Sequence, residues 1–338
     1  MTAVIPAGVT TARELVQPAL AAALERLSPQ VRRVAAYHLG LADARGRPCQ
    51  AGGKALRPAL ALLSVRAAGC PAERGIAAAV AVELVHNFSL LHDDIMDGDT
   101  ERRHRPTAWA VFGVPAAILA GDALLALAQD ILLEDGAPQG RWAARCLLAA
   151  MRRLIAGQGA DIGFEARADV SMDECLTMAG DKTAALMACA SSIGAIFAGA
   201  PPGLAMSLAD YGSHTGLAFQ LVDDLLGIWG APEVTGKPVW SDLRSRKKTL
   251  PVVAALHGSD REAAGQLGGL LGRDTALGEA DLELAAALVE KAGGRAWAEA
   301  ETTRQLETAL GCLDEAGVGG DVRDELTGIA RFITERTY

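Results

Sequence analysis

The chain has 338 residues, half of them hydrophobic and 22% charged, while aromatic residues make up only 4%. Its formal net charge of −9 argues against a general affinity for nucleic acid or for an anionic membrane surface. The six cysteines include no CxxC pair, so we expect reduced cytoplasmic thiols and neither a zinc ribbon nor a disulfide framework.

Hydrophobic periodicity predicts an all-α protein. Residues 1–12 lack the features of a signal peptide and are expected to be a disordered tail. No linker divides the rest, so we expect one domain over 1–338. Apolar residues recur every three or four positions, which predicts helices at 13–26, 55–68, 74–92, 115–133, 141–156, 172–196, 203–229 and 279–293. Alternating β-branched residues are almost absent, so we expect about ten or more helices, with peripheral ones in the last hundred residues.

The segment from Thr183 to Ala209 carries no charge, which allows two interpretations. Pro201 and Pro202 divide it, and its first part is shorter than the roughly 20 apolar residues that a spanning helix needs. We therefore expect a buried core helix here and no membrane span.

An acidic cluster ends the apolar helix predicted at 74–92. Asp93 and Asp97 are one helical turn apart, so their carboxylates share a face about 6 Å apart along the axis. Like charges at this spacing, and acid at a helix C-terminus, both destabilise the helix unless a cation compensates. The cluster therefore predicts a Mg²⁺–diphosphate site, the alternative being a solvated helix end.

A second acidic pair, Asp223 and Asp224, lies within another apolar helix. Charges among Leu and Val side chains are costly to bury unless they are paired or bound to a metal. Two such pairs on separate helices can face each other across a bundle, although a structural ion-pair network is an alternative.

Basic residues accompany both acidic clusters. Lys54 and Arg57 are three residues apart and able to converge on one anion, and further cations follow each acidic pair at Arg102, Arg103, Lys237 and Lys247. A short basic run is usually a solvated surface, but together these residues predict a site for two diphosphates.

In these motifs the chain resembles the trans-isoprenyl diphosphate synthases, or polyprenyl synthetase family, of the short-chain type that includes geranylgeranyl diphosphate synthase. The resemblance covers about residues 15–255 and rests on five ordered motifs: Gly53-Lys54-x-x-Arg57-Pro58, Asp93-Asp94-Ile95-Met96-Asp97 with Arg102-Arg103, Lys182-Thr183-Ala184, Phe219-Gln220-x-x-Asp223-Asp224, and Gly236-Lys237 through Pro251. Two departures stand out. Gly227 replaces a third aspartate, and Trp240 and Arg246 replace glycines.

The resemblance implies a helical bundle around a central cavity, a cytoplasmic homodimer, and Mg²⁺-dependent condensation of isopentenyl diphosphate with allylic diphosphates. It implies about three ions held by Asp93, Asp97 and Asp223. The implied catalytic residues are Asp93, Asp94, Asp97, Arg102, Lys182, Thr183, Gln220, Asp223, Asp224 and Lys237. The allylic diphosphate is assigned to Arg102, Lys182, Lys237 and Lys247, and isopentenyl diphosphate to Lys54, Arg57, His86 and Arg103. His86 is equally interpretable as a packing residue.

Product length is expected to depend on Phe88 and Ser89, which lie about one turn before Asp93. A bulky Phe88 predicts a floor after a few isoprene units, although it is also interpretable as ordinary core packing. The first motif lacks a two-residue insertion, which favours a C20 product, geranylgeranyl diphosphate, over C15. A class I terpene cyclase and a non-catalytic subunit of a prenyl synthase remain as alternatives from other classes.

Overall fold

The computed structural model describes residues 6–49, 51–134, 136–167, 169–232, 239–273 and 275–334, and it confirms the predicted all-α fold. The first half contains α1 (Ala7–Leu24), α2 (Pro29–His38), α3 (Leu56–Ala67), the short helix η1 (Ala72–Gly75), α4 (Ile76–Met96), α5 (Ala108–Phe112), α6 (Val114–Leu133) and α7 (Pro138–Glu165). The second half contains α8 (Met172–Ala179), the π-helical turn η2 (Gly180–Ala184), α9 (Ala185–Phe197), α10 (Pro202–Trp229), α12 (Ser241–Arg244), α13 (Leu250–Leu256), α14 (Arg261–Leu271), α15 (Glu279–Lys291), α16 (Gly294–Glu315) and α17 (Gly320–Thr334).

Two local predictions differ from the structure. Residues 7–12, expected in a disordered tail, form the first turns of α1, because Val9 and Ala12 have buried side chains that anchor them to the core. A small antiparallel hairpin, β1 (Glu101–Arg102) with β2 (Arg105–Pro106), follows the first acidic cluster. Strands this short carry no alternating pattern that the sequence could reveal.

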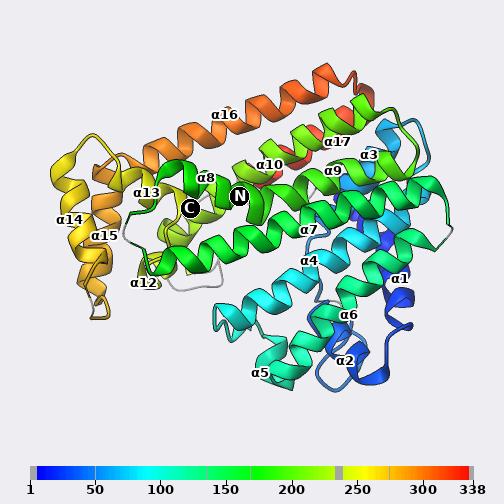
Figure 1. Cartoon of the computed structure of the whole chain (residues 1–338), viewed down its shortest axis with the longest axis horizontal. Helices are drawn as coiled ribbons and strands as arrows, with labels where there is room; N and C mark the ends of the chain where they lie inside the picture. The colour runs from blue at the N-terminus through cyan, green and yellow to red at the C-terminus, as the bar shows by residue number, and fades with distance from the viewer. Residues whose placement is uncertain are drawn as a thin grey trace.

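The main hydrophobic core lies where α3, α4, α6, α7, α9 and α10 pack against one another (Figure 1). Helix α9 shows why the uncharged segment after Thr183 forms a core helix. Most of its side chains are buried, and Gly194 and Gly212 lack side chains where α9 meets the backbone or side chains of neighbouring helices. The prediction of a buried core helix is confirmed.

Helix α10 connects this core with the C-terminal part of the chain. It runs beside α9 and α16, and α14 and α15 lie together at one end of the molecule (Figure 1). Helix α16 packs against α10 along one face, where its buried Gln305 lies 2.6 Å from His214 of α10, and its other faces are partly or fully exposed. Helix α10 therefore carries the second acidic pair through the middle of the bundle.

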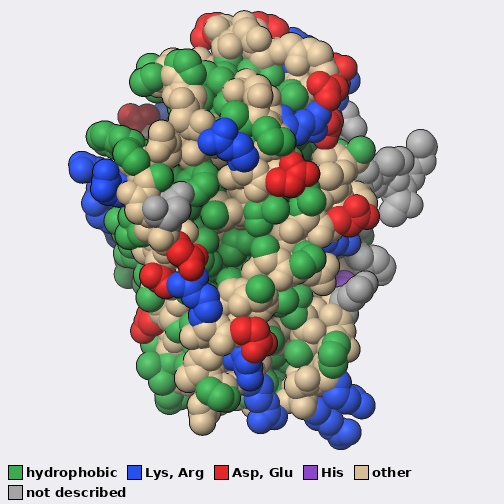
Figure 2. Space-filling model, turned by 90° about the vertical axis from the view of Figure 1, so that its right-hand side faces the viewer, with side chains coloured by type: hydrophobic (Ala, Val, Ile, Leu, Met, Phe, Trp, Pro, Cys, Tyr) green, Lys and Arg blue, Asp and Glu red, His purple; other side chains and the backbone are tan. Residues whose placement is uncertain are grey.

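Within the described part of the chain, two helices are long and apolar enough to cross a membrane by length and composition, Ala72–Met96 and Val114–Leu133. The first is 67% buried within the fold over its most apolar window, as a core helix would be. Figure 2 shows one face of the molecule, on which acidic and basic side chains are interspersed between hydrophobic patches.

Candidate active site

Asp93 and Asp97 lie at the C-terminal end of α4, as the sequence predicts. Asp93 Oδ1 is 3.7 Å from Lys182 Nζ. Burial raises the pKa of Asp93, nearby Asp97 raises it further, and Lys182 acts in the opposite direction. The first acidic cluster is therefore compensated by a cation that comes from elsewhere in the chain, not by solvent.

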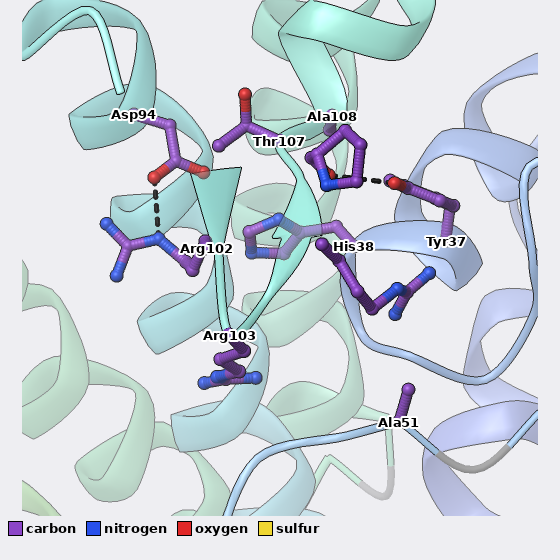
Figure 3. A pocket seen from close by; sticks show the side chains of 10 residues that line it. Tyr37, His38, Ala51, Asp94, Arg102, Arg103, Thr107 and Ala108 are labelled. Atoms are coloured by element: carbon purple, nitrogen blue, oxygen red, sulfur yellow. Dashed lines mark hydrogen bonds and ion pairs between the residues drawn. The ribbon is translucent and has the colours of Figure 1, made fainter. Parts of the chain in front are cut away.

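Asp94 has a different role from its neighbour. It is 1% exposed, and Arg102 Nε donates a hydrogen bond to its Oδ1 at 2.6 Å (Figure 3). Burial raises the pKa of Asp94 to about 6 even though Arg102 lowers it. Arg102, predicted to bind the allylic diphosphate, is thus tied to the aspartate through the β1–β2 hairpin.

The hairpin turn places Arg103 and His104 in left-handed conformations, with φ of 53° and 58°. Positive φ at both central residues is the geometry of a type I′ turn, which matches the twist of the two strands. The turn separates the two arginines. Arg102 points toward Asp94, whereas the guanidinium of Arg103 packs against the backbone of Gly53 in the first basic motif.

Lys182 lies in η2, where one wide helical turn joins α8 to α9. Single π-turns of this kind are frequent at functional sites. Lys182 Nζ donates a hydrogen bond to Asp161 of α7, and the α7 backbone approaches Lys182 closely because residue 157 is glycine. Sequence reasoning missed Asp161, which lies in a helix of mixed composition and has no acidic neighbour in the sequence.

Lys247 completes the cationic side of the first cluster. Its Nζ donates a hydrogen bond to Asp97 Oδ2 at 3.0 Å. Burial lowers the pKa of Lys247, but Asp97, Asp161 and Asp242 outweigh burial and raise it overall. Lys182 and Lys247 thus reach the same group of carboxylates from two distant segments.

The two aspartates of the second acidic pair, on α10, also have different surroundings. Asp224 is 5% exposed and accepts hydrogen bonds from the backbone N–H of Leu250, at 2.9 Å, and from Gln220 Nε2, at 2.7 Å. Burial raises its pKa to about 7, and the neighbouring Asp242 adds to this effect. Thr183 in turn donates to Gln220, so a hydrogen-bonded chain links η2, α10 and the start of α13.

Asp223 is half-buried, and its charge acts on Arg57 of α3. The described residues therefore place Asp223 toward the first basic motif, while Asp224 supports the backbone of α13. Lys237, predicted to bind the allylic diphosphate, lies outside the described residues, as does Gly236.

The structure shows the surroundings of Gly227, Trp240 and Arg246, the residues that depart from the family motifs. A side-chain carbon added at Gly227 would overlap the carboxylate of Asp242, so glycine leaves room for this side chain. Trp240 and Arg246, which replace glycines, adopt φ of 62° and 54°. The loop thus keeps left-handed conformations that glycine usually provides, at some cost in backbone strain.

A second basic group surrounds Arg57. Its Nη1 donates to His86 Nε2 at 3.2 Å, because a guanidinium has no acceptor. Burial, together with Arg57 and Arg103, lowers the pKa of His86 well below its ordinary value, so the imidazole is neutral. Half-buried Glu83 is a further member of this group that sequence reasoning missed. Asn87 donates to it at 3.0 Å, and burial raises its pKa.

Lys54 lies at the edge of this group, with Nζ 5.0 Å from the centre of the Phe332 ring in α17. The C-terminal helix thus reaches the first basic motif. His38 lines a small pocket with Arg102, Arg103 and Arg105 (Figure 3). Burial and these three cations lower the pKa of His38 to about 3.

The residues predicted to control product length lie one turn before the acidic cluster. Phe88 is 6% exposed and packs edge-on against His92, while the hydroxyl of half-buried Ser89 donates to the carbonyl of His86 in its own helix. The Phe88 ring is therefore held in contact with His92, and the Ser89 hydroxyl is hydrogen-bonded within its own helix.

The acidic side chains of the site can be compared with the ligands and geometry that a bound metal ion requires. Among the described residues, no three Asp, Glu, His or Cys side chains lie close enough together to enclose an ion. Asp93, Asp97 and Asp223 offer only hard oxygen atoms, which suit Mg²⁺. Mg²⁺ usually takes one or two carboxylates and completes its shell with water and substrate phosphate. These residues fit an open Mg²⁺–diphosphate site better than a closed metal cage.

Comparison with known proteins agrees with this arrangement. The polyprenyl synthetase family model matches residues 41–288. The chain is 50% identical over 329 residues to (2E,6E)-farnesyl diphosphate synthase of Mycobacterium tuberculosis, covering 96% of this chain and 91% of that protein. It is 45% identical over 302 residues to geranylgeranyl diphosphate synthase of the same organism, covering 88% and 86%. The crystal structure of a polyprenyl synthetase from Streptomyces coelicolor superimposes with a TM-score of 0.92 at 52% identity, covering 97% of this chain and 98% of that one.

The chain belongs to the polyprenyl synthetase family. Its fold is the all-α isoprenoid synthase fold. Within the family it is a short-chain trans-isoprenyl diphosphate synthase, and therefore a prenyltransferase.

Proposed function

We propose that this enzyme condenses isopentenyl diphosphate head to tail with an allylic diphosphate in a Mg²⁺-dependent reaction. The observation that supports this most directly is the meeting of Asp93 and Asp97 with Lys182 and Lys247, which come from distant parts of the chain. Carboxylates for a metal beside cations for phosphate match the needs of a departing diphosphate.

Asp93, Asp97 and Asp223 are the proposed metal ligands, and we propose three Mg²⁺ ions per site. Bound Mg²⁺ would supply Lewis-acid stabilisation of the departing diphosphate. Lys182 and Lys247 pair with Asp93 and Asp97, so each lysine is held at the place where diphosphate oxygens would bind.

Lys182, Lys247 and Arg102 are the proposed cations for the allylic diphosphate, together with Lys237. Fixed positive charge of this kind stabilises the negative charge that develops on the leaving group. Asp161 holds Lys182, and Asp94 holds Arg102, so both cations are oriented before substrate binds. Asp94 and Asp224 are therefore proposed to act by positioning their neighbours.

The isopentenyl diphosphate site is proposed at Arg57 and Arg103, with Lys54 and His86. Neutral His86 accepts a hydrogen bond from Arg57, which fixes the guanidinium without adding a further charge. Glu83 offsets the charge of both arginines before the anion arrives. The two diphosphates would thus bind to separate cationic groups on either side of the acidic clusters.

The reaction breaks the allylic C–O bond and forms a new C–C bond to the isopentenyl double bond. A proton then leaves the resulting cation, and we propose that the released diphosphate accepts it. Thr183 and Gln220 are polar but uncharged, and their hydrogen bond orients the two dipoles next to the apolar part of the site. Neither side chain would capture the cation as a nucleophilic carboxylate would.

The proposed main product is C15, farnesyl diphosphate. The sequence alone favoured C20, but the relative named farnesyl diphosphate synthase has 50% identity and the one named geranylgeranyl diphosphate synthase has 45%. Buried Phe88 suits a floor after few isoprene units. Geranylgeranyl diphosphate remains the second candidate, since small Ser89 lies beside Phe88 and the first motif has no insertion.

We propose a cytoplasmic homodimer with one domain per chain and no nucleic-acid partner. Helix α7 exposes Leu148, Ile155 and Ile162 at seven-residue intervals, and Trp142 is 62% exposed on the same helix. Neighbouring α6 exposes Ile118 and Leu119. An apolar face over two adjacent helices is the kind of surface that a second copy would cover.

The test is an incubation of purified protein with isopentenyl diphosphate, Mg²⁺ and, separately, C5, C10 and C15 allylic diphosphates, with products sized by mass spectrometry. We expect C15 diphosphate from the C5 and C10 primers. Extension of all three primers to C20 would replace the farnesyl assignment with the geranylgeranyl one. A hydrocarbon product, or no turnover with any primer, would contradict the proposed reaction.

A further inference from the structure

His92 occupies the space between α4 and α6, directly beside Phe88. The centres of the two rings are 4.9 Å apart at an interplanar angle of 67°, an edge-to-face contact. Residues 88 and 92 are one helical turn apart on α4, so they share a face of the helix. The ring of His92 therefore lies between Phe88 and the end of α4 that carries Asp93.

Helix α6 holds the His92 ring from the other side. A side-chain carbon at position 121 would overlap the imidazole, so Gly121 makes the space that the ring fills. His92 Nε2 donates to the backbone carbonyl of Ile118 at 3.2 Å, and Asp122 Oδ1 lies 3.8 Å from the same nitrogen. A ring in contact on two sides and hydrogen-bonded to a main chain has little freedom to rotate.

We propose that His92 is a positioning residue for product length, which holds the Phe88 ring in place as the floor of the product cavity. This inference rests on the proposed function, because it assumes that the growing chain meets Phe88. The phenyl ring alone is able to turn about its side-chain bonds. His92 packs against the Phe88 ring, and α6 lies on the other side of His92. The Phe88 side chain therefore has no room to move toward α6.

The position of His92 also explains how the floor keeps a fixed distance from the reacting carbon. His92 directly precedes Asp93, the proposed metal ligand, and Phe88 lies one turn deeper on the same helix. One turn of a helix rises about 5.4 Å. The diphosphate end and the floor are thus set by one rigid segment, and α6 fixes this segment through His92 and Gly121.

The experiment compares product lengths from the C5 and C10 primers for the wild-type enzyme and His92→Ala, His92→Phe, Phe88→Ala and the double variant. We expect His92→Ala to raise the fraction of products longer than the wild-type end point severalfold. His92→Phe keeps a planar ring and is expected to restore the wild-type distribution. Because His92 acts through Phe88, the double variant should make no longer products than Phe88→Ala alone.

Asp122→Asn is the matched control, since it removes the charge near His92 and leaves the ring contact. Unchanged product lengths are expected, whereas lengthening equal to that of His92→Ala would overturn the packing argument. If Phe88→Ala lengthens products and His92→Ala only lowers the melting temperature, His92 is structural and the inference is wrong. If Phe88→Ala also leaves the products unchanged, the floor itself is wrong. An inactive wild-type enzyme would instead contradict the proposed function.

Discussion

Lys247 donates a hydrogen bond to Asp97 across 150 residues of sequence. Lys182 forms a longer ion pair with Asp93, at 3.7 Å, and donates a hydrogen bond to Asp161. In both acidic pairs, the first aspartate lies beside the site while the second is buried on a structural partner: Asp94 on Arg102, and Asp224 on the Leu250 N–H. In each Asp-Asp pair, the first carboxylate thus faces the proposed metal site and the second, buried carboxylate accepts hydrogen bonds from structural partners.

Replacing Lys247 tests the cationic side of the site. Lys247→Met keeps the length of the side chain but removes the charge that pairs with Asp97. Loss of one fixed group that stabilises developing charge lowers kcat by about 10²-fold or more. Steady-state kinetics with both substrates would measure this, and Lys248→Met is the control in the next position. Similar rates in the two variants would remove Lys247 from the catalytic group.

The two aspartates of α10 are expected to respond differently to substitution. Asp223→Ala should abolish turnover and leave the melting temperature nearly unchanged, because the proposed role of Asp223 is metal binding. Asp224→Ala should lower the free energy of unfolding by about 1–3 kcal/mol, since it leaves the Leu250 N–H and the Gln220 amide without their buried acceptor. Urea unfolding and activity measured on both variants would check the contrast. Equal stability losses would contradict the division of roles.

The sequence predicted the helices and both acidic clusters because charges within apolar helices are rare and their spacing is visible. It could not predict which cation meets which carboxylate, since Lys182 and Lys247 reach α4 through tertiary packing alone. Asp161 and Glu83 were missed because neither lies next to another acidic residue in the sequence, so neither forms part of a visible acidic cluster. The β1–β2 hairpin was missed because its strands are two residues long, although it directs Arg102 and Arg103 to opposite partners.

The pocket near His38 predicts a dependence of stability on pH. The pKa of His38 is lowered to about 3 by burial and by Arg103, Arg102 and Arg105. Between its unfolded pKa of about 6.5 and its folded pKa, the unfolded chain binds the extra proton. The contribution of neutral His38 to the free energy of unfolding is therefore fully present above about pH 6.5 and is lost as the pH falls toward 3.

Melting temperatures of wild-type protein and His38→Gln between pH 7 and pH 4 would check this sign. Glutamine keeps a polar side chain of similar length but cannot gain a charge. We expect the wild type to lose more stability than His38→Gln over this range, and a parallel decline in both proteins would show that other groups dominate.

The turn of the hairpin allows a stabilising substitution. His104 is exposed with φ of 58°, a conformation that costs a residue with a side chain roughly 1–2 kcal/mol. His104→Gly should remove this strain and raise the free energy of unfolding by about 1 kcal/mol, part of the gain being offset by the greater freedom of glycine in the unfolded chain. His104→Ala is the matched control, because it removes the same imidazole but keeps the strained backbone. Urea unfolding of both variants separates the two effects. A gain in His104→Ala as large as in His104→Gly would mean that the imidazole, and not the backbone, destabilises the turn that carries Arg102 and Arg103.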